Sequence, residues 1–448
     1  MNYQEFKTAV IEEAKKAGLT EYELYYSGAV SMEVSTYKDT IERFANSDGG
    51  GACFRCIADG KAGYAATELF TEEAAAELVQ NALANAAVIE SEDPIILKEV
   101  GDTYQACDLK PMKALDASGL QQVSLDLQKK LFEKEKRITE GTQVIGAYEV
   151  RERAIMNSKG LDLSHSVSLG LLYPMPVIAE GGEMYDGDEM YLGDLLKADT
   201  NALADVAIAE AVCKIGAETV ETKKYNCVFS GRMMGTLLQT FSQVFFADTA
   251  QQGLSLLQGK EGEAVASEKV TLVDDPFYAD SYIQYPFDAE GSAAYTKNII
   301  ENGVFQTFLH NLTTAAKGGC ETTGNAGRPG YASPLCIMPY NFYIKPGELN
   351  LEQMLEQLGD GIYVTELQGM HAGANPITGD FSLAAAGYLV ENGKKTKAIK
   401  NFTVSDNFYS FLKKISMVGG DLKFGFPQGQ SVFGSPSVRV EDISVAGK

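Results

Sequence analysis

The sequence has few histidines and comparatively little positive charge. Three histidines occur in 448 residues, and 38 Lys and Arg residues stand against 61 Asp and Glu residues, a formal net charge of −23. A molecule with this charge repels phosphate backbones, and no Lys- or Arg-rich run offers a local exception. We therefore expect no direct binding of nucleic acid.

Long apolar runs are missing as well. No run of about 18 apolar residues occurs, and the first residues, Met1 to Phe6, lack a basic segment followed by an apolar core. These absences predict a cytoplasmic protein without membrane contact. The seven cysteines are odd in number and scattered, which does not fit a disulfide framework. We expect reduced thiols.

The first part of the chain combines helices with strands. Apolar periodicity predicts helices at residues 2–17 and from Thr71 to about residue 88, and a strand-rich segment lies between them at residues 22–68. Two turn signals divide that segment, one at residues 46–49 and one at Asp59-Gly60. This pattern predicts an N-terminal α+β domain, which we place at residues 1–100.

A second unit of the same kind follows a segment of low periodicity at residues 91–110. It has a predicted helix at about 111–136, strands between 143 and 181, and another helix at about 200–216. We place a central α+β domain at residues 101–222.

From about Tyr225 the pattern changes to short strands joined by hairpin turns such as Asn302-Gly303 and Asn392-Gly393. These strands follow one another too closely for crossover helices, which predicts a mostly antiparallel, barrel-like β domain over residues 223–448. The apolar stretch at residues 233–246 is long enough for about three helical turns. We expect it to be a helix buried against the strands, within an α+β fold overall.

Eight short motifs occur in order along the chain. Each is weak evidence alone, but the ordered set, within about residues 30–447, is specific. The motifs are NSKG at 157–160, GLS at 253–255, VDDP at 273–276, PFDAEG at 286–291, TGNAGR at 323–328, TGDFS at 378–382, GYLVENG at 387–393 and GSPS at 434–437. Together they resemble the TldD/PmbA family, whose older label is modulator of DNA gyrase.

The resemblance allows the predicted apolar helix at residues 233–246 to be compared with the zinc-binding helix of the family. The family contains TldD, a zinc peptidase whose helix carries an HExxxH motif, and PmbA, also called TldE, which lacks that motif and pairs with TldD. Aligned to this motif, the present chain has Gln239 for the first His, Thr240 for the Glu and Val244 for the second His, and the family's cysteine ligand falls near Gly425. Valine offers no donor atom and threonine cannot act as a base near neutral pH. The resemblance thus implies no zinc in this chain and zinc only in a TldD-like partner.

Other polar residues could contact a ligand. His371 lies in a Gly-rich loop, where functional residues often occur, whereas His165 and His310 are better explained as structural. Asp288 and Glu290 could converge with Asp380 as a cation site or an acid/base pair, although turn capping and pairing with Arg328 are the simpler interpretation. The candidate ligand-facing residues are His371, Asp288, Glu290, Asn325, Arg328 and Asp380.

Three functional hypotheses follow from the sequence. In the first, implied by the resemblance, the chain is a PmbA/TldE-like subunit, not catalytic alone, in a dimeric TldD/TldE-type metallopeptidase that degrades or matures cytosolic peptides. In the second, it is a stand-alone peptidase that uses a non-standard carboxylate site. In the third, it is a homodimeric module that binds extended peptides at a sheet edge without cleaving them.

Overall fold

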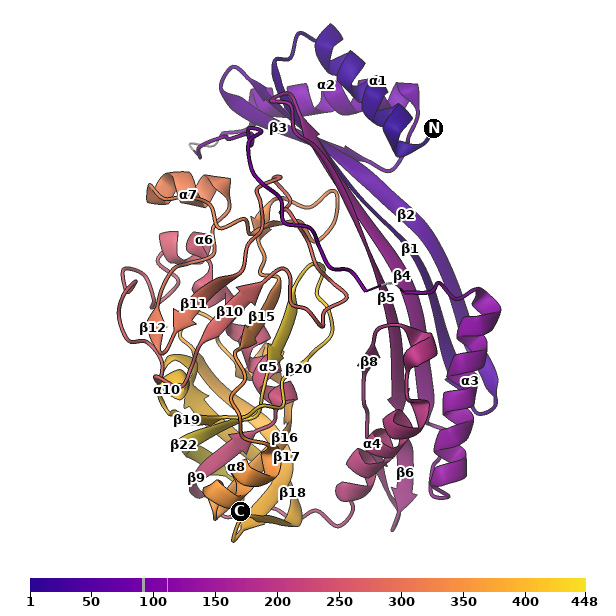
Figure 1. Cartoon of the computed structure of the whole chain (residues 1–448), viewed down its shortest axis with the longest axis vertical. Coiled ribbons are helices and arrows are strands. Elements are labelled where there is room, and N and C mark those ends of the chain that lie inside the picture. The colour runs from indigo at the N-terminus through magenta and orange to yellow at the C-terminus, as the bar shows by residue number, and fades with distance from the viewer. Residues whose placement is uncertain (91–92, 111) are drawn as a thin grey trace.

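The computed structural model describes residues 1–90, 93–110 and 112–448 (Figure 1). Within these ranges, the N-terminal half is built on a six-stranded sheet with the order β3-β2-β1-β4-β5-β8. Long antiparallel strands run the length of this half (Figure 1). The strands are β1 (Glu21–Tyr37), β2 (Thr40–Ala58), β3 (Lys61–Thr67), β4 (Gln143–Asn157), β5 (Asp162–Met175) and β8 (Tyr191–Leu192).

The two predicted helix-plus-strand units share this sheet. β1 of the first unit pairs with β4 of the second in antiparallel register, from Glu23 opposite Asn157 to Ser35 opposite Ile145. The helices pack near opposite ends of the long strands (Figure 1), where each pair buries its own apolar cluster. They are α1 (Tyr3–Lys16) and α2 (Glu72–Val88) at one end, and α3 (Ala117–Lys134) and α4 (Thr200–Cys213) at the other.

One predicted turn in this half is wrong and one is correct. Residues 46–49 lie inside β2, where Asn46 pairs with Met32 and Gly49 with Ala29. Continuous pairing with β1 has overridden the local turn signal. At Asp59-Gly60 both residues have positive φ, 51° and 76°, as a type I′ hairpin turn requires.

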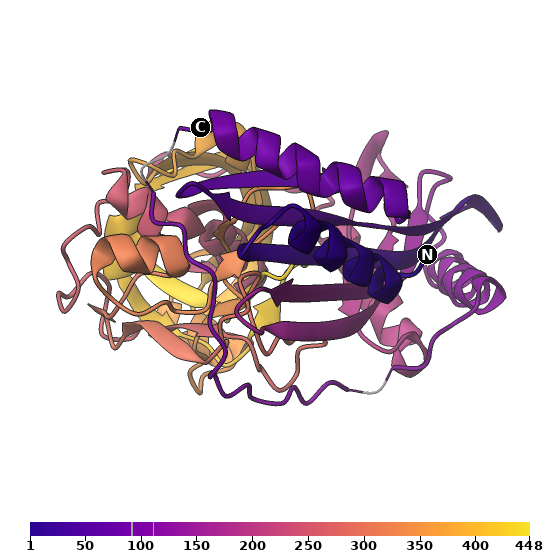
Figure 2. The same ribbon diagram turned by 90° about the horizontal axis from the view of Figure 1, so that it is seen from above.

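The connection from α2 to α3 is extended and bound to the C-terminal half (Figures 1 and 2). Asp102 accepts the backbone N–H of Ala293 at 2.9 Å, and the Tyr104 hydroxyl donates to the Gly291 carbonyl at 2.9 Å. Ser91 and Pro111, where the low-periodicity segment and the second-unit helix were predicted to begin, lie outside the described residues. The helix begins at Ala117, after the cap residue Asp116, so residues 112–116 are not helical, contrary to the prediction.

The C-terminal half contains the predicted barrel. β18, β17, β16, β9 and β22 pair in that order, and a further pairing between β18 and β22 closes the ring. The β9–β16 pair is parallel and the others are antiparallel. The strands are β9 (Lys223–Phe229), β16 (Gly361–Gln368), β17 (Asp380–Glu391), β18 (Lys394–Asn407), β22 (Val438–Ala446) and, paired outside the ring, β19 (Ile415–Val418).

A second six-stranded sheet lies beside the barrel, with the order β12-β11-β10-β15-β21-β20. Its hairpin turn at Asn302-Gly303, like that at Asn392-Gly393 in the barrel, has positive φ at both residues, which confirms the two Asn-Gly predictions. The strands are β10 (Leu272–Asp275), β11 (Lys297–Glu301), β12 (Val304–Phe305), β15 (Asn341–Ile344), β20 (Lys423–Phe424) and β21 (Val432–Ser435).

Smaller elements complete the fold. The remaining helices are α5 (Gly231–Phe241), α6 (Ala247–Gln251), α7 (Leu312–Gly318), α8 (Leu351–Leu358), α9 (Met370–Gly373) and α10 (Phe408–Lys413), with 3₁₀ turns η1 (Leu195–Lys197) and η2 (Ser242–Phe245). The remaining strands form two short hairpins, β6 (Val177–Glu180) with β7 (Glu183–Asp186), and β13 (Ala326–Gly327) with β14 (Cys336–Ile337).

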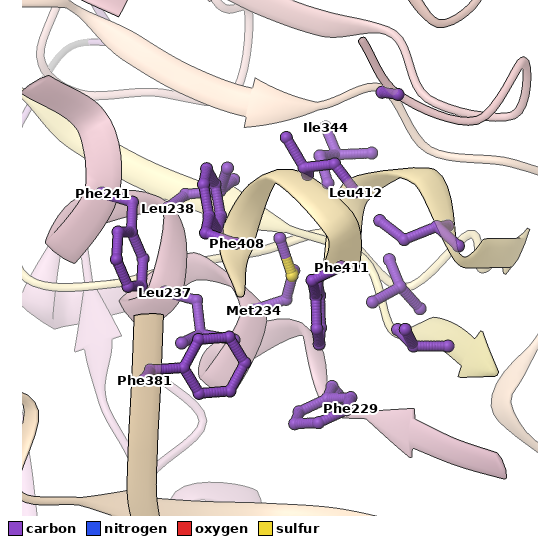
Figure 3. Close-up of a cluster of buried hydrophobic side chains, with 14 of the residues drawn as sticks. Phe229, Met234, Leu237, Leu238, Phe241, Ile344, Phe381, Phe408, Phe411 and Leu412 are labelled. Atoms are coloured by element: carbon purple, nitrogen blue, oxygen red, sulfur yellow. The ribbon is translucent and has the colours of Figure 1, made fainter. Parts of the chain in front are cut away.

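Helix α5 is buried in the C-terminal core, as the sequence predicted. Met234, Leu237, Leu238 and Phe241 are fully buried and face aromatic side chains of the barrel and α10 (Figure 3). The ring of Phe241 stacks on that of Phe408 with centroids 4.6 Å apart. None of the described helices is both long and apolar enough to cross a lipid bilayer.

Candidate functional site: a cleft between the two halves

A cleft of about 510 Å³ lies between the β5–β8 side of the N-terminal sheet and α5 with β20 of the C-terminal half. Most of its wall is apolar or aromatic, and a few polar groups are interspersed, a composition typical of ligand sites. Its lining residues are Leu169, Tyr173, Asp188, Glu189, Met190, Leu192, Arg232, Gly235, Thr236, Gln239, residues 280–283, residues 423–428, Val432 and Phe433.

Helix α5 supplies one wall of the cleft because it is amphipathic. The Ser230 hydroxyl caps its first turn by accepting the N–H of Met233 at 3.4 Å. The apolar stripe is buried in the core, while Arg232, Thr236 and Gln239 follow one another at helical spacing on the opposite stripe and line the cleft.

The four positions implied by the zinc-peptidase motif have different environments in the structure. Gln239 and Gly425, far apart in sequence, line the same cleft. The Thr240 hydroxyl instead donates to the Thr236 carbonyl at 2.8 Å, within its own helix. Val244 lies beyond the end of α5, in η2, and is completely buried in the hydrophobic core.

These residues do not fit a zinc ion. An amide side chain and a glycine replace the expected donors at the cleft, and structural or catalytic zinc sites require three or four nitrogen, sulfur or carboxylate ligands. The carboxylates nearby already have partners, since Asp188 pairs with Arg232 at 2.5 Å and Glu189 lies 3.4 Å from Lys423. Among the described residues, no group of three or more His, Cys, Asp or Glu side chains is arranged to hold a metal ion.

Asp288 and Glu290 lie in a buried turn. The Asp288 carboxylate accepts the backbone N–H groups of Glu290, Ser292 and Ala326 at 2.9–3.0 Å, which agrees with the turn-capping interpretation. One oxygen of Glu290 accepts the N–H of Leu312 at 2.9 Å, and the other has no hydrogen-bond partner among the described residues.

The pKa values of both carboxyl groups in this turn are raised. Burial raises the pKa of Asp288 to about 6, although the three backbone donors act in the opposite direction. Burial, and then the neighbouring charge of Asp288, raise the pKa of Glu290 to about 8.

Asp380 does not join these two acids, so the alternative of a three-acid site is wrong. It is exposed on barrel strand β17 and accepts a hydrogen bond from the Asn407 amide at 2.9 Å. Asp288 is completely buried, in the loop that connects β10 to β11 of the second C-terminal sheet. The described residues therefore offer no three-carboxylate site for a stand-alone peptidase.

The remaining sequence candidates have different environments. His371 is exposed on α9 and does not line the cleft. Asn325 is buried, donates to Asp274 at 2.7 Å and accepts from Lys297 at 3.1 Å, so it completes a buried ion pair. Arg328 makes no ion pair among the residues that the structure describes, in contrast to the pairing expected with the acids. It lines a second cavity.

Sequence reasoning missed most of the cleft. Arg232 could have been found, because it lies on the same α5 stripe as Gln239. Tyr173, Tyr282 and Phe426 come from three separate segments that only the tertiary structure brings to the cleft. No periodicity or spacing in the chain indicates that they share a site.

Comparison with known proteins places the chain in a family. Models of the PmbA/TldA metallopeptidase match in three parts: domain 1 at residues 22–86, the central domain at 111–222 and the C-terminal domain at 222–447. A metalloprotease of Methanocaldococcus jannaschii is 28% identical over 413 residues, covering 89% of this chain and 90% of the relative.

Two crystal structures share the fold. One, described as a modulator of DNA gyrase from Thermotoga maritima, has a TM-score of 0.89 and 29% identity, and covers 99% of this chain and 100% of that chain. TldE from Thermococcus kodakarensis has a TM-score of 0.87 and 22% identity over the same shares. The chain therefore belongs to the TldD/PmbA family of metallopeptidase-like proteins.

Proposed function

We propose that this chain is the PmbA/TldE-like subunit of a two-subunit peptidase, in which a TldD-like partner supplies the zinc and both subunits together enclose a peptide in the cytosol. The proposal rests on the residues found at the zinc-motif positions in and near the α5 cleft. Gln239 and Gly425 line it without a zinc donor, and Val244 is buried in the core. The fold shared with TldE supports the same assignment.

The test combines metal analysis with mixing. The purified chain should contain far less than one zinc per molecule and should not hydrolyse unstructured peptides. Adding a TldD-like subunit from the same cell should produce hydrolysis that a chelator abolishes. Stoichiometric zinc in the chain alone, accompanied by hydrolysis, would contradict the proposal.

A role in peptide binding is favoured by the position of the cleft. β8 ends one sheet and β20 ends the other, and residues of both strands line the cleft. Within the described residues, each of these two-residue strands pairs on one side only, which leaves an edge to which an extended peptide can add as a further strand. This observation also supports the third hypothesis, a self-dimer that binds peptides without turnover. Retained peptide and a homodimeric mass, with no activity after mixing, would favour it.

Filling the cleft should block peptide binding. Gln239→Trp places an indole on the exposed stripe of α5, and we expect at least a tenfold loss of peptide affinity, about 1.4 kcal/mol, with little change in the free energy of unfolding. Calorimetric titration with an unstructured peptide measures the loss. Gln357→Trp, at an exposed position of α8 away from the cleft, is the matched control and should leave affinity unchanged.

A further inference from the structure

A second cavity, of about 690 Å³, lies between β2 and β3 of the N-terminal sheet and α6, α7 and the loop at residues 328–335 of the C-terminal half. Its described lining residues do not overlap with those of the α5 cleft. Cationic side chains predominate among its charged residues, which are Arg55, Lys61, Lys317, Arg328, Asp93 and Asp248.

Arg328 is the unusual member of this set. Its side chain is 8% exposed, and one terminal nitrogen, Nη1, donates to the Ser333 carbonyl at 2.7 Å. Its Nε and Nη2 atoms are shielded from solvent and have no hydrogen-bond partner within the described chain. The guanidinium lies 5.2 Å from the centre of the Tyr25 ring, which holds the side chain in place but does not neutralise it.

A buried cation without an acid is unfavourable by several kcal/mol, so the unused nitrogens of Arg328 need an explanation. Nε and the adjacent Nη2 form one edge of the planar guanidinium. This edge presents two parallel N–H groups, the arrangement that binds a carboxylate or phosphate in a bidentate manner. No described protein group accepts a hydrogen bond from that edge.

The charge of the cavity distinguishes between these two anions. Arg55 is paired with the buried Glu23 at 2.9 Å, and Lys317 is paired with Asp93. Lys61, at the exposed rim, has no ion-pair partner within the described ranges. Among the described lining residues, Arg328 and Lys61 against Asp248 leave one excess positive charge, which matches a singly charged carboxylate better than a doubly charged phosphate.

We propose that this cavity binds a carboxylate group, held by the Nε–Nη2 edge of Arg328 and attracted by Lys61. The carboxylate belongs to a peptide, either at its C-terminus or on an acidic side chain. The peptide source rests on the proposed function, whereas the carboxylate site itself does not.

The first experiment tests the site with acetate. The melting temperature is measured in two series at constant ionic strength. In one series sodium acetate replaces sodium chloride, and in the other sodium phosphate replaces it. Acetate should raise the melting temperature of the natural chain, and phosphate should raise it less. Arg328→Gln should melt at the same or a higher temperature in chloride, because it removes an unpaired buried charge, and should lose the response to acetate.

Two further variants complete this test. Lys61→Ala, at an exposed position, will fold even if Arg328→Gln does not, and should require several-fold more acetate for the same rise. Lys269→Ala, exposed and outside the cavity, should respond like the natural chain. An acetate response that is absent from the natural chain, or undiminished by both Arg328→Gln and Lys61→Ala, would overturn the proposal.

The second experiment identifies the source of the carboxylate. Calorimetry compares an acetylated alanine peptide with a free C-terminus, the same peptide amidated, and an amidated peptide with one internal aspartate. We expect binding to depend on a carboxylate and to weaken at least tenfold in Arg328→Gln. If acetate acts through Arg328 but neither acidic peptide does, the carboxylate site stands and the peptide source is wrong, independently of the zinc and mixing results.

Discussion

Replacing Val244 by histidine is expected to destabilise the protein by about 3–5 kcal/mol rather than to create a zinc ligand. Val244 is completely buried among apolar side chains, so an imidazole there would lose its water and strain the packing. Gln239→His, on the cleft wall, should change the free energy of unfolding by less than about 0.5 kcal/mol. Urea denaturation with both variants measures the difference.

Val244→Ala provides the control for packing alone. It removes two methyl groups without adding a polar group and should cost about 2 kcal/mol, less than histidine. A Val244→His protein with unchanged stability, or one that binds zinc tightly together with Gln239→His, would contradict this interpretation of α5. The expected result means that the metal site cannot be restored by exchanging the motif residues one at a time.

Glu290→Gln is expected to make the protein more stable than the natural chain at alkaline pH. The pKa of Glu290 is raised to about 8 in the folded protein, so the folded state binds a proton that the unfolded state releases near pH 4.5. The corresponding stability is fully present below about pH 4.5 and is lost as the pH rises through about 8. At pH 9 the glutamine variant should be more stable by about 2–4 kcal/mol.

The comparison of unfolding free energies between pH 5 and pH 9 tests this expectation. The difference between the natural chain and Glu290→Gln should grow with pH, because only the natural chain must ionise a buried carboxyl group. Glu99→Gln, at an exposed position, should leave the pH dependence unchanged. Parallel curves for the natural chain and Glu290→Gln would show that Glu290 is already ionised in the folded state at neutral pH.

The fold was predictable where local geometry decides it. The Asn302-Gly303 and Asn392-Gly393 turns formed as expected because both residues of each pair tolerate positive φ. The turn expected at residues 46–49 did not form, because these residues pair along their whole length with β1. Long-range strand pairing is stronger than a local turn preference of this kind.

The candidate site was predictable only in part. The family resemblance named both Gln239 and Gly425 in advance, and both line the cleft. The resemblance alone could not place Val244, because the α-helix ends at Phe241 and the following 3₁₀ turn directs Val244 into the core. The position of Asp380 on the barrel, apart from Asp288, was also decided by the path of the chain.

The sequence by itself determined the α+β class, the buried helix and the hairpin turns at Asp59-Gly60, Asn302-Gly303 and Asn392-Gly393. These properties follow from periodicity, residue chemistry and turn geometry, which act over a few neighbouring residues. Only the tertiary structure decided that β1 and β4 join two units into one sheet, that residues of the end strands β8 and β20 line the same cleft, and that Arg328 is buried with no acidic partner among the described residues. These depend on contacts between distant segments, and no local pattern in the chain encodes which segments meet.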